Sequence, residues 1–302
     1  MVTGRVMRVT LVHNPTAGDE QHSGDALTAA IEAEEHEVAY QSVKDEEWKR
    51  ALAAPADLVA VAGGDGTVRK VFRELAGKPV PATLIPLGTA NNIARTLGFH
   101  TDDPMRLVRG WPSADRRPFD IGGIESPWGQ VAFVEATGGG LFAEVLVHAE
   151  HENGELDKVR HGLEVLDELL DHAATHPWEL DADGDRIAGD FLAVEALNVR
   201  ETGPNLPLAP DADPGDRVLE LVLVRPEDRA ALAQHVRARL NGGRGAPLPF
   251  ERRAVRRMAF SPPADCPLRV DEELWPGDAN RRAGAELVVS ARWRLDVLVP
   301  PV

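Results

Sequence analysis

The sequence predicts an α/β fold made of two domains, and two features of the sequence support this prediction. From residue 6 to about residue 97, short apolar runs alternate with segments whose apolar residues recur at helical spacing, which is typical of a parallel α/β sheet. From residue 119 onward, strand-like runs dominate, which favours a mostly antiparallel, β-sandwich-like domain. We therefore expect domains over residues 1–121 and 122–302, and the extreme C-terminus could pack back on the first domain.

The expected first domain is a Rossmann-like arrangement of alternating strands and helices. Its strand-like runs are short and apolar, and each is followed within a few residues by helical periodicity, as where Leu27, Ala30 and Ile31 recur at helical spacing. The expected strands cover residues 6–12, 36–42, 57–62 and 82–86, and the expected helices cover residues 24–35, 46–54, 68–75 and 93–97.

The expected second domain contains short strands interrupted by two helices. Apolar residues at helical spacing predict helices over residues 159–174 and 226–240. Asp183-Gly184, between two strand-like segments, predicts a tight hairpin turn. The expected strands cover residues 119–124, 131–137, 178–182, 191–199, 218–224, 254–260, 268–270, 286–290 and 293–299.

The composition argues against several classes of function. A chain of 302 residues with 43% hydrophobic residues can bury a substantial core, and its formal net charge of −16 argues against nucleic acid as a partner. Cys266 is the only cysteine, so we expect neither a disulfide nor a cysteine-based zinc site within one chain. No run approaches the roughly 20 apolar residues of a transmembrane segment. We expect a cytoplasmic protein, either free or peripheral at a membrane, and a homodimer stays open.

The most informative stretch is the turn Gly63-Gly64-Asp65-Gly66-Thr67 between an expected strand and an expected helix. Glycines let another group approach the backbone closely, and the N–H groups of a turn that begins a helix can bind phosphate. Asp65 indicates phosphate together with a metal ion, since a bare carboxylate would repel phosphate. The alternative is an ordinary tight turn.

Two further turns follow expected strands. They are Asn14-Pro15-Thr16-Ala17-Gly18 and Leu87-Gly88-Thr89-Ala90-Asn91-Asn92. Each alone could be an ordinary turn, or a loop with an asparagine cap on a helix. Because ligands bind beyond the carboxyl ends of parallel strands, three such turns at three strand ends indicate a binding site.

Together and in this order, the three turns resemble the catalytic domain of the diacylglycerol kinase family, which includes bacterial lipid kinases, ceramide kinases and sphingosine kinases. The Gly-Gly-Asp-Gly-Thr signature is shared with NAD kinases, whereas Asn-Pro-x-x-Gly and Gly-Thr-x-Asn point to the lipid-kinase branch. The resemblance implies an ATP-dependent lipid kinase that phosphorylates the hydroxyl of diacylglycerol or a related lipid alcohol at a membrane surface. The nucleotide-binding residues that it implies are Asn14, Pro15, Thr16, Gly18, Ser42, Gly63, Gly64, Asp65, Gly66, Thr67, Gly88, Thr89 and Asn91.

The resemblance also implies Mg2+ beside ATP. Phe119-Asp120-Ile121-Gly122 resembles the family segment in which an aspartate joins a metal–water network near the phosphates. Asp65 and Asp120 are therefore expected to hold the ion directly or through water. Gly138-Gly139-Gly140-Leu141-Phe142-Ala143 occupies the place of the Gly-Phe-Asp-Ala motif.

A second magnesium site is implied near residue 216. The segment 213–220 resembles the Asp-Gly-x-Leu-Asp loop, which binds a structural magnesium in bacterial members. The contacts would come from Asp216, with Asp213 and Val218 contributing mainly backbone oxygens. The alternative is an acidic turn before the strand 218–224.

The general base is implied by Val270-Asp271-Glu272-Glu273, which sits where the family carries Val-Asp-Gly-Glu. Asp271 or Glu273 would deprotonate the attacking alcohol. The expected catalytic residues are therefore Asp271, Glu273 and Asp65, and the choice of base between the first two stays open.

Several residues depart from the family pattern. Arg69-Lys70 stands where the family usually has Asn-Glu, Asn92 and Phe142 each replace an aspartate, and Glu272 replaces a glycine. Two alternatives therefore stay open: a kinase of NAD or another soluble alcohol, and a catalytically impaired nucleotide-binding protein.

One basic cluster stands out in the second half. It consists of Arg252, Arg253, Arg256 and Arg257. We expect a solvated strand face, and the alternative is a contact with lipid headgroups.

Overall fold

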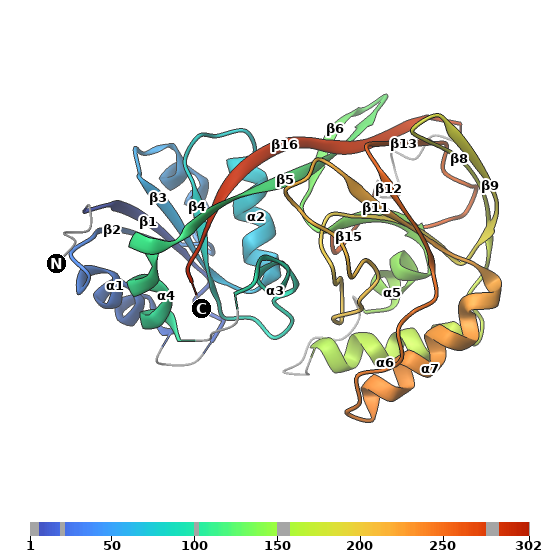
Figure 1. Ribbon diagram of the computed structural model, residues 1–302, viewed down its shortest axis with the longest axis horizontal. Helices are drawn as coiled ribbons and strands as arrows, with labels where there is room; N and C mark the ends of the chain where they lie inside the picture. The colour runs from blue at the N-terminus through green and yellow to red at the C-terminus, as the bar shows by residue number, and fades with distance from the viewer. Residues whose placement is uncertain (1–5, 19–21, 100–102, 150–157, 276–283, 302) are drawn as a thin grey trace. The chain divides into compact units, whose positions relative to one another are not determined.

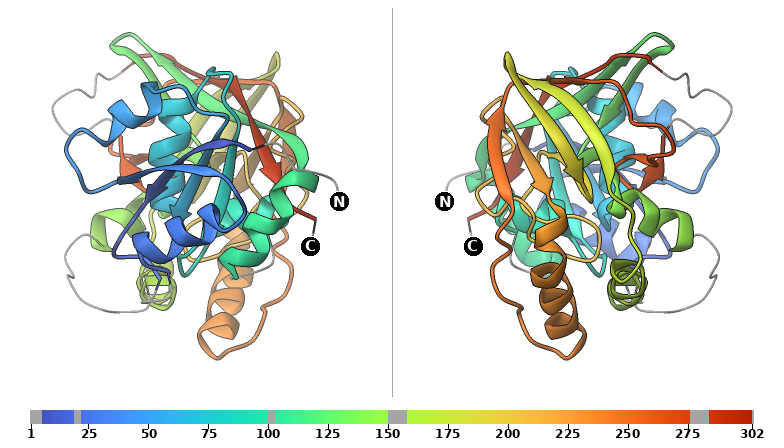
Figure 2. Two further views of the ribbon diagram at one scale, coloured as in Figure 1. Left: turned by 90° about the vertical axis from the view of Figure 1, so that its left-hand side faces the viewer. Right: turned by 90° about the vertical axis from the view of Figure 1, so that its right-hand side faces the viewer.

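The computed structural model describes residues 6–18, 22–99, 103–149, 158–275 and 284–301, and it divides the chain into two compact units (Figures 1 and 2). The first unit consists of residues 1–121 and 293–302, and the second of residues 122–292. The first unit is a parallel α/β structure and the second is mainly antiparallel β. The predicted fold class is confirmed.

The first unit contains a parallel sheet with the strand order β2-β1-β3-β4. The end of β16 joins this sheet, because Val297 pairs in parallel with Ala82 of β4. The strands are β1 (Arg8–His13), β2 (Glu37–Ser42), β3 (Leu58–Gly63), β4 (Ala82–Pro86) and β16 (Leu287–Val299), and the helical segments are α1 (Gly24–Glu32), η2 (Trp48–Ala53), α2 (Asp65–Leu75), α3 (Asn92–Leu97), α4 (Pro104–Gly110) and η3 (Trp111–Ser113).

Helices cover the sheet of the first unit on both faces. All six residues of β3 are buried, which explains why this strand is a continuous apolar run in the sequence. Leu27 and Ile31 of α1 and Val108 of α4 share one core cluster with alternate residues of β1 and β3. On α2, Phe72 packs edge-on against Phe119, with ring centroids 5.2 Å apart.

The predicted elements of the first unit agree with the structure to within three residues at each end, and the differences concern η2 and the unpredicted segments α4 and η3. The segment predicted as a helix over residues 46–54 forms the 3-10 helix η2. Helix α4 was not predicted, although its start carries a strong signal: Asp103 accepts hydrogen bonds from the N–H groups of Met105 and Arg106, and Pro104 occupies the first turn.

The second unit contains two antiparallel sheets. In one, β16 pairs with β13, β13 with β8, β8 with β9, and β5 with β6, and the other has the order β12-β11-β10-β7-β14-β15. The strands are β5 (Asp115–Ser126), which begins in the first unit, β6 (Gly129–Phe133), β7 (Ala136–Gly140), β8 (His176–Ala182), β9 (Asp185–Phe191), β10 (Ala193–Leu197), β11 (Leu219–Val224), β12 (Glu251–Val255), β13 (Arg257–Phe260), β14 (Leu268–Val270) and β15 (Glu273–Leu274).

The two sheets share a core, and helices cover the far face of the second sheet. Trp178 and Phe260 from one sheet belong to the same buried cluster as Leu221 and Leu268 from the other. The helical segments are α5 (Leu141–Ala149), α6 (Lys158–Leu170), η4 (Pro226–Asp228) and α7 (Arg229–Leu240), and α6 and α7 lie side by side (Figures 1 and 2). Their apolar residues form a second cluster with β7, β10 and β11.

Several elements of the second unit differ from the predictions, and β15 and most of β9 were not predicted. The predicted strands 131–137 and 254–260 are each two strands in different sheets, β6 with β7 and β12 with β13, because the chain passes from one sheet to the other while the apolar pattern continues. The predicted strands 286–290 and 293–299 form the single strand β16, and α5 was not predicted. The hairpin turn is confirmed, since Asp183 and Gly184 connect β8 to β9 with φ values of 53° and 97°.

Among the described residues, no helix combines the length and the apolar character needed to cross a membrane.

Candidate active site

The first unit brings the three predicted turns to one edge of its sheet. The turns follow β1, β3 and β4, which are neighbours in the sheet and run parallel. The backbone N–H of Asn14 donates to the carbonyl of Ala62 at 2.9 Å, and the N–H of Leu87 donates to the carbonyl of Gly63 at 3.0 Å. The turn after β3 therefore lies between the other two.

Two of these turns approach so closely that each needs a glycine. A Cβ atom placed on Gly88 would lie 2.5 Å from the Cα of Gly64, and a Cβ on Gly64 would lie 3.0 Å from the Cα of Gly88. Gly66 is different, because it is exposed and a Cβ there would meet only the Arg69 guanidinium, at 3.6 Å. The signature glycines thus serve different purposes, and Gly66 leaves the backbone accessible at the first turn of α2.

Asp65 links α2 to α3. Its carboxylate is buried, with one oxygen accepting from the N–H of Asn92 and the other from the N–H of Ile93, both at 3.0 Å. Carboxylates are favourable at this position, because the first N–H groups of a helix lack partners within it. The residue before α3 cannot do this, since Asn91 has φ 51° and its side chain bonds the backbone N–H and carbonyl of Gly88.

The turn after β1 is held by its own side chains. The Oδ1 atom of Asn14 accepts from the backbone N–H of Thr16 at 3.3 Å and from its hydroxyl at 3.0 Å. Pro15 lies between these two residues, and Gly18 has φ 80°. At the end of β2, the hydroxyl of Ser42 accepts from the N–H of Lys44 at 3.1 Å.

The remaining predicted nucleotide-binding residues differ in exposure. Thr67 is buried in the first turn of α2, and its side chain occupies the space beside Gly63. Thr89 is exposed in the turn after β4. Two of the residues that depart from the family pattern lie on α2: Arg69 is buried and Lys70 is exposed.

Asp120 lies at the opposite end of the sheet from these turns. Both of its carboxylate oxygens accept from Arg294, with Nε–Oδ1 at 2.7 Å and Nη2–Oδ2 at 3.0 Å. Arg294 precedes Val297, which pairs with the first residue of β4, whereas the turn after β4 follows its last residue. The structure therefore does not bring Asp120 and Asp65 together.

Asp65 and Asp120, the two predicted magnesium ligands beside the phosphates, both have hydrogen-bond partners within the chain. Asp65 accepts hydrogen bonds from two backbone N–H groups, and Asp120 forms a bidentate ion pair with Arg294. Magnesium prefers several oxygen ligands in near-octahedral geometry. Across the described parts of the chain, no group of three Asp, Glu, His or Cys side chains is placed to hold a metal.

The second predicted magnesium loop forms local turns. The Oδ1 atom of Asp213 accepts from the N–H of Gly215, and that of Asp216 accepts from the N–H of Val218, both at 2.9 Å. These bonds are typical of turns in which an aspartate side chain holds the backbone two residues ahead. The geometry matches the acidic-turn alternative.

In the second unit, Asp271 and Glu273 lie in different environments. Asp271 is fully buried, and its carboxylate accepts from the backbone N–H groups of Val134, Glu135 and Ala136 at distances from 2.7 to 3.2 Å. Glu273 is exposed at the start of β15. Of the two predicted bases, only Glu273 presents its carboxylate to solvent.

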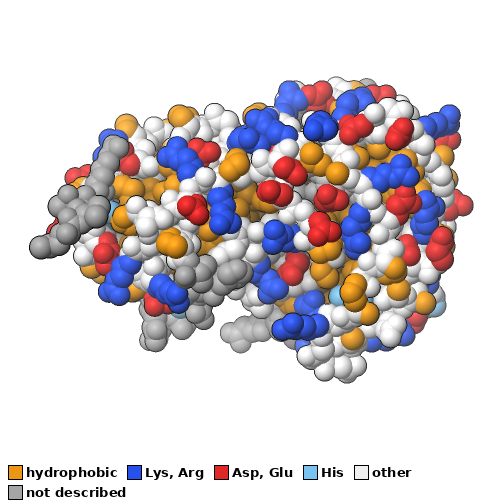
Figure 3. Space-filling view, viewed as in Figure 1, with side chains coloured by type: hydrophobic (Ala, Val, Ile, Leu, Met, Phe, Trp, Pro, Cys, Tyr) orange, Lys and Arg blue, Asp and Glu red, His pale blue; other side chains and the backbone are white. Residues whose placement is uncertain are grey.

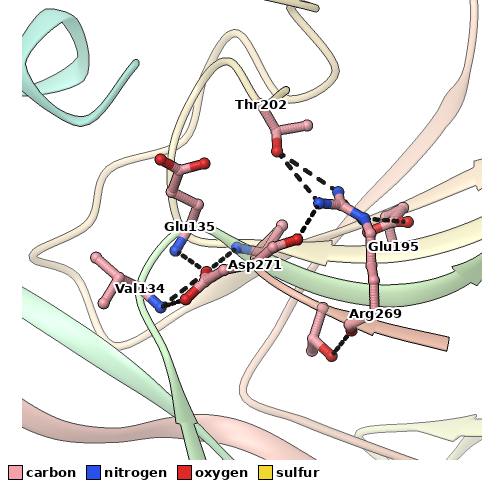
Figure 4. Close-up of polar contacts among 8 residues, drawn as sticks. Val134, Glu135, Glu195, Thr202, Arg269 and Asp271 are labelled. Atoms are coloured by element: carbon pink, nitrogen blue, oxygen red, sulfur yellow. Dashed lines mark hydrogen bonds and ion pairs between the residues drawn. The ribbon is translucent and has the colours of Figure 1, made fainter. Parts of the chain in front are cut away.

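A buried ion pair beside this turn was not predicted (Figure 4). Arg269 on β14 forms two hydrogen bonds with Glu195 on β10, at 3.0 and 2.9 Å. An arginine between the apolar residues Leu268 and Val270 of a short strand is the sequence signal for such a pair, but it does not identify the partner.

Two other sequence features have structural roles. Phe142, at the position of the family aspartate, belongs to the buried cluster beneath α5, α6 and α7. In the basic cluster, Arg252 donates to three backbone carbonyls, Arg253 pairs with Glu251, and Arg257 lies near Asp181. Figure 3 shows basic and acidic side chains interspersed on the face that it draws, which agrees with a solvated surface.

The comparisons with known proteins cover the part of the chain that contains the turns after β1, β3 and β4. Residues 8–124, which contain all three, match the family model described as "Diacylglycerol kinase catalytic domain". The chain is 28% identical over 251 residues to a protein from Bacillus subtilis named diacylglycerol kinase, and the alignment covers 79% of each chain. The resemblance drawn from the motifs is confirmed for residues 8–124, which match the model of the diacylglycerol kinase catalytic domain.

Two solved structures show the same fold. The crystal structure of a diacylglycerol kinase from Bacillus anthracis has a TM-score of 0.70 and 18% identity, and the match covers 97% of each chain. An NAD kinase from Archaeoglobus fulgidus in complex with ATP has a TM-score of 0.51 and 12% identity, covering 97% of this chain and 94% of that one. At these identities the likeness concerns the fold alone.

Proposed function

We propose that this protein is an ATP-dependent lipid kinase that transfers the γ-phosphate to the hydroxyl of diacylglycerol or a related lipid alcohol. The observation that supports this proposal best is the meeting of three glycine-containing turns at the carboxyl edge of β1, β3 and β4. The family of residues 8–124 supports phosphoryl transfer, and the relative from Bacillus subtilis, named diacylglycerol kinase, supports a lipid acceptor.

In this proposal the first unit binds the ATP phosphates. Phosphoryl transfer requires mainly positioning and neutralisation of charge. Backbone N–H groups at the start of α2 would donate to phosphate oxygens, because Gly66 leaves room for their approach. Lys70 is exposed one turn further along and would add positive charge. Asp65 would act by fixing the starts of α2 and α3 relative to each other.

The proposed base is Glu273. Its carboxylate takes the proton of the lipid hydroxyl while the hydroxyl oxygen bonds to the γ-phosphorus, and the bond from that phosphorus to the β–γ bridging oxygen breaks to release ADP. The exposure of Glu273 supports this choice over Asp271, whose carboxylate oxygens accept several backbone N–H groups.

The test is phosphate transfer from radiolabelled ATP to mixed micelles containing diacylglycerol, ceramide or sphingosine. We expect label on one of these lipids and at least a hundredfold lower rate for Glu273→Gln. ATP binding without labelled lipid would refute the lipid kinase. Label on NAD in a parallel incubation would instead identify a kinase of a soluble alcohol. Sedimentation with vesicles would test the peripheral membrane contact that a lipid substrate requires.

A further inference from the structure

The ion pair between Arg269 and Glu195 is among the most buried polar features of the second unit (Figure 4). The side chains are 4% and 0% exposed, and the two hydrogen bonds are parallel, Nε to Oε1 and Nη2 to Oε2. Burial acts to lower the pKa of Arg269, but attraction and hydrogen bonding to Glu195 outweigh it and hold the pKa above its ordinary value. Arg269 is therefore charged.

This pair spans a strand, and a glycine leaves the space for it. Glu195 and Arg269 each pair with Gly138 of β7, from opposite sides, so the three residues form one row across the sheet. The backbones of the two charged residues are thus two strand spacings apart, about 9–10 Å, and the long side chains cover this distance. A Cβ on Gly138 would lie 2.8 Å from the Glu195 carboxyl carbon and would also clash with the carbonyl of Val194.

The other side of the Arg269 guanidinium holds the turn that leads to Glu273. Its Nη1 atom donates to the backbone carbonyl of Asp271 at 2.8 Å. Asp271 has φ 54°, a left-handed conformation that is unfavourable for a residue with a side chain. Its own N–H donates to the carbonyl of Ala136 at 2.7 Å. Glu273 follows Asp271 by two residues, and it is the antiparallel strand partner of Val270 between β14 and β15.

A buried ion pair needs a reason other than stability. Replacing such a pair with apolar side chains of similar volume is often neutral or stabilising, because the charges lose their hydration on burial. Apolar side chains could fill the space beside Gly138, but they could not donate to the carbonyl of Asp271. That hydrogen bond distinguishes this pair from a packing element.

We propose that Arg269, held by Glu195 across Gly138, is a positioning residue that fixes the Asp271 turn so that Glu273 meets the lipid hydroxyl. This inference rests on the proposed kinase function. Asp271 contributes to the same assembly, because its carboxylate anchors the turn to residues 134–136.

The test is the double variant Arg269→Met/Glu195→Leu, assayed for lipid phosphorylation and thermal unfolding. We expect unfolding within a few degrees of the wild type, since the apolar pair removes both charges together. We expect kcat to fall about 10- to 100-fold, because a displaced base loses alignment with the hydroxyl. KM for ATP and the pH at which kcat falls on the acidic side should not change, since Glu273 is still the base.

The matched control is Arg186→Met/Glu179→Leu, which removes an ion pair of 2.8 Å between neighbouring strands of the same unit, with side chains 75% and 71% exposed. It should leave kcat unchanged. A double variant at residues 269 and 195 with kcat within twofold of the wild type would refute the positioning role and leave the kinase standing. A wild-type chain that phosphorylates no lipid would refute the proposed function, and this role with it.

Discussion

The closest approach between two site turns gives a quantitative prediction for Gly88→Ala. The added Cβ would lie 2.5 Å from the Cα of Gly64, whereas ordinary contact begins at 3.4 Å, so one backbone must move by about 0.9 Å. Overpacking of this kind costs about 1–3 kcal/mol. The same displacement carries the N–H groups after β4 away from their positions, so ATP affinity should fall as well.

Gly66→Ala is the matched control, because it changes a glycine of the same site without a clash. Its Cβ would have no neighbour closer than 3.6 Å, and alanine in a helix is more favourable than glycine by about 0.5–1 kcal/mol. The free energies of unfolding of the two variants should therefore differ by about 1.5–4 kcal/mol. Urea unfolding followed by circular dichroism measures this difference. Equal stability of the two variants would refute the close approach of the two turns.

Three further predictions concern buried polar groups. The pKa of His36 is lowered, chiefly by burial. The free energy of unfolding should therefore fall as the pH drops below about 6.5, because the unfolded chain then binds a proton more readily than the folded chain. His36→Gln should flatten this dependence in urea unfolding measured between about pH 5 and 8. Arg294→Met leaves the buried carboxylate of Asp120 without its guanidinium and should lower the free energy of unfolding by about 3–5 kcal/mol; a loss below about 1 kcal/mol would contradict this. Asp271→Asn puts an amide NH2 in place of the Oδ2 that accepts from the Val134 N–H, and it removes the charge from the bonds that Oδ1 accepts. It should cost about 1–3 kcal/mol in the same assay, whereas unchanged stability would point to a functional carboxylate.

The fold of the first unit was predictable because each of its signals is local. A parallel strand covered on both faces is an apolar run, and the run over residues 82–86 coincides with β4. The turns at Asn14, Gly63 and Gly88 were also predictable, since neighbouring parallel strands must end at one edge. The close contact between two of these turns was not predictable, because nothing in the sequence shows that Gly88 lies against the Cα of Gly64.

The second unit was harder to predict because its strands change sheets. Residues 131–137 carry one continuous apolar pattern, yet Val134 and Glu135 lie between β6 and β7 and donate their N–H groups to Asp271 instead of to a sheet partner. A pattern with a period of two residues reports which residues are buried. It does not report which of two sheets buries them.

The carboxylates show why a motif alone does not assign a role. Asp65, Asp120 and Asp271 were each expected at the reaction, as metal ligand or base, and each is buried and accepts hydrogen bonds from N–H groups within the chain. Their partners lie 28, 174 and 136 residues away along the chain. A buried carboxylate that accepts several N–H groups stabilises the elements that donate them. Glu273 is exposed, so we expect the chemistry at the second unit to follow Glu273 and its rate to follow the groups that hold its turn.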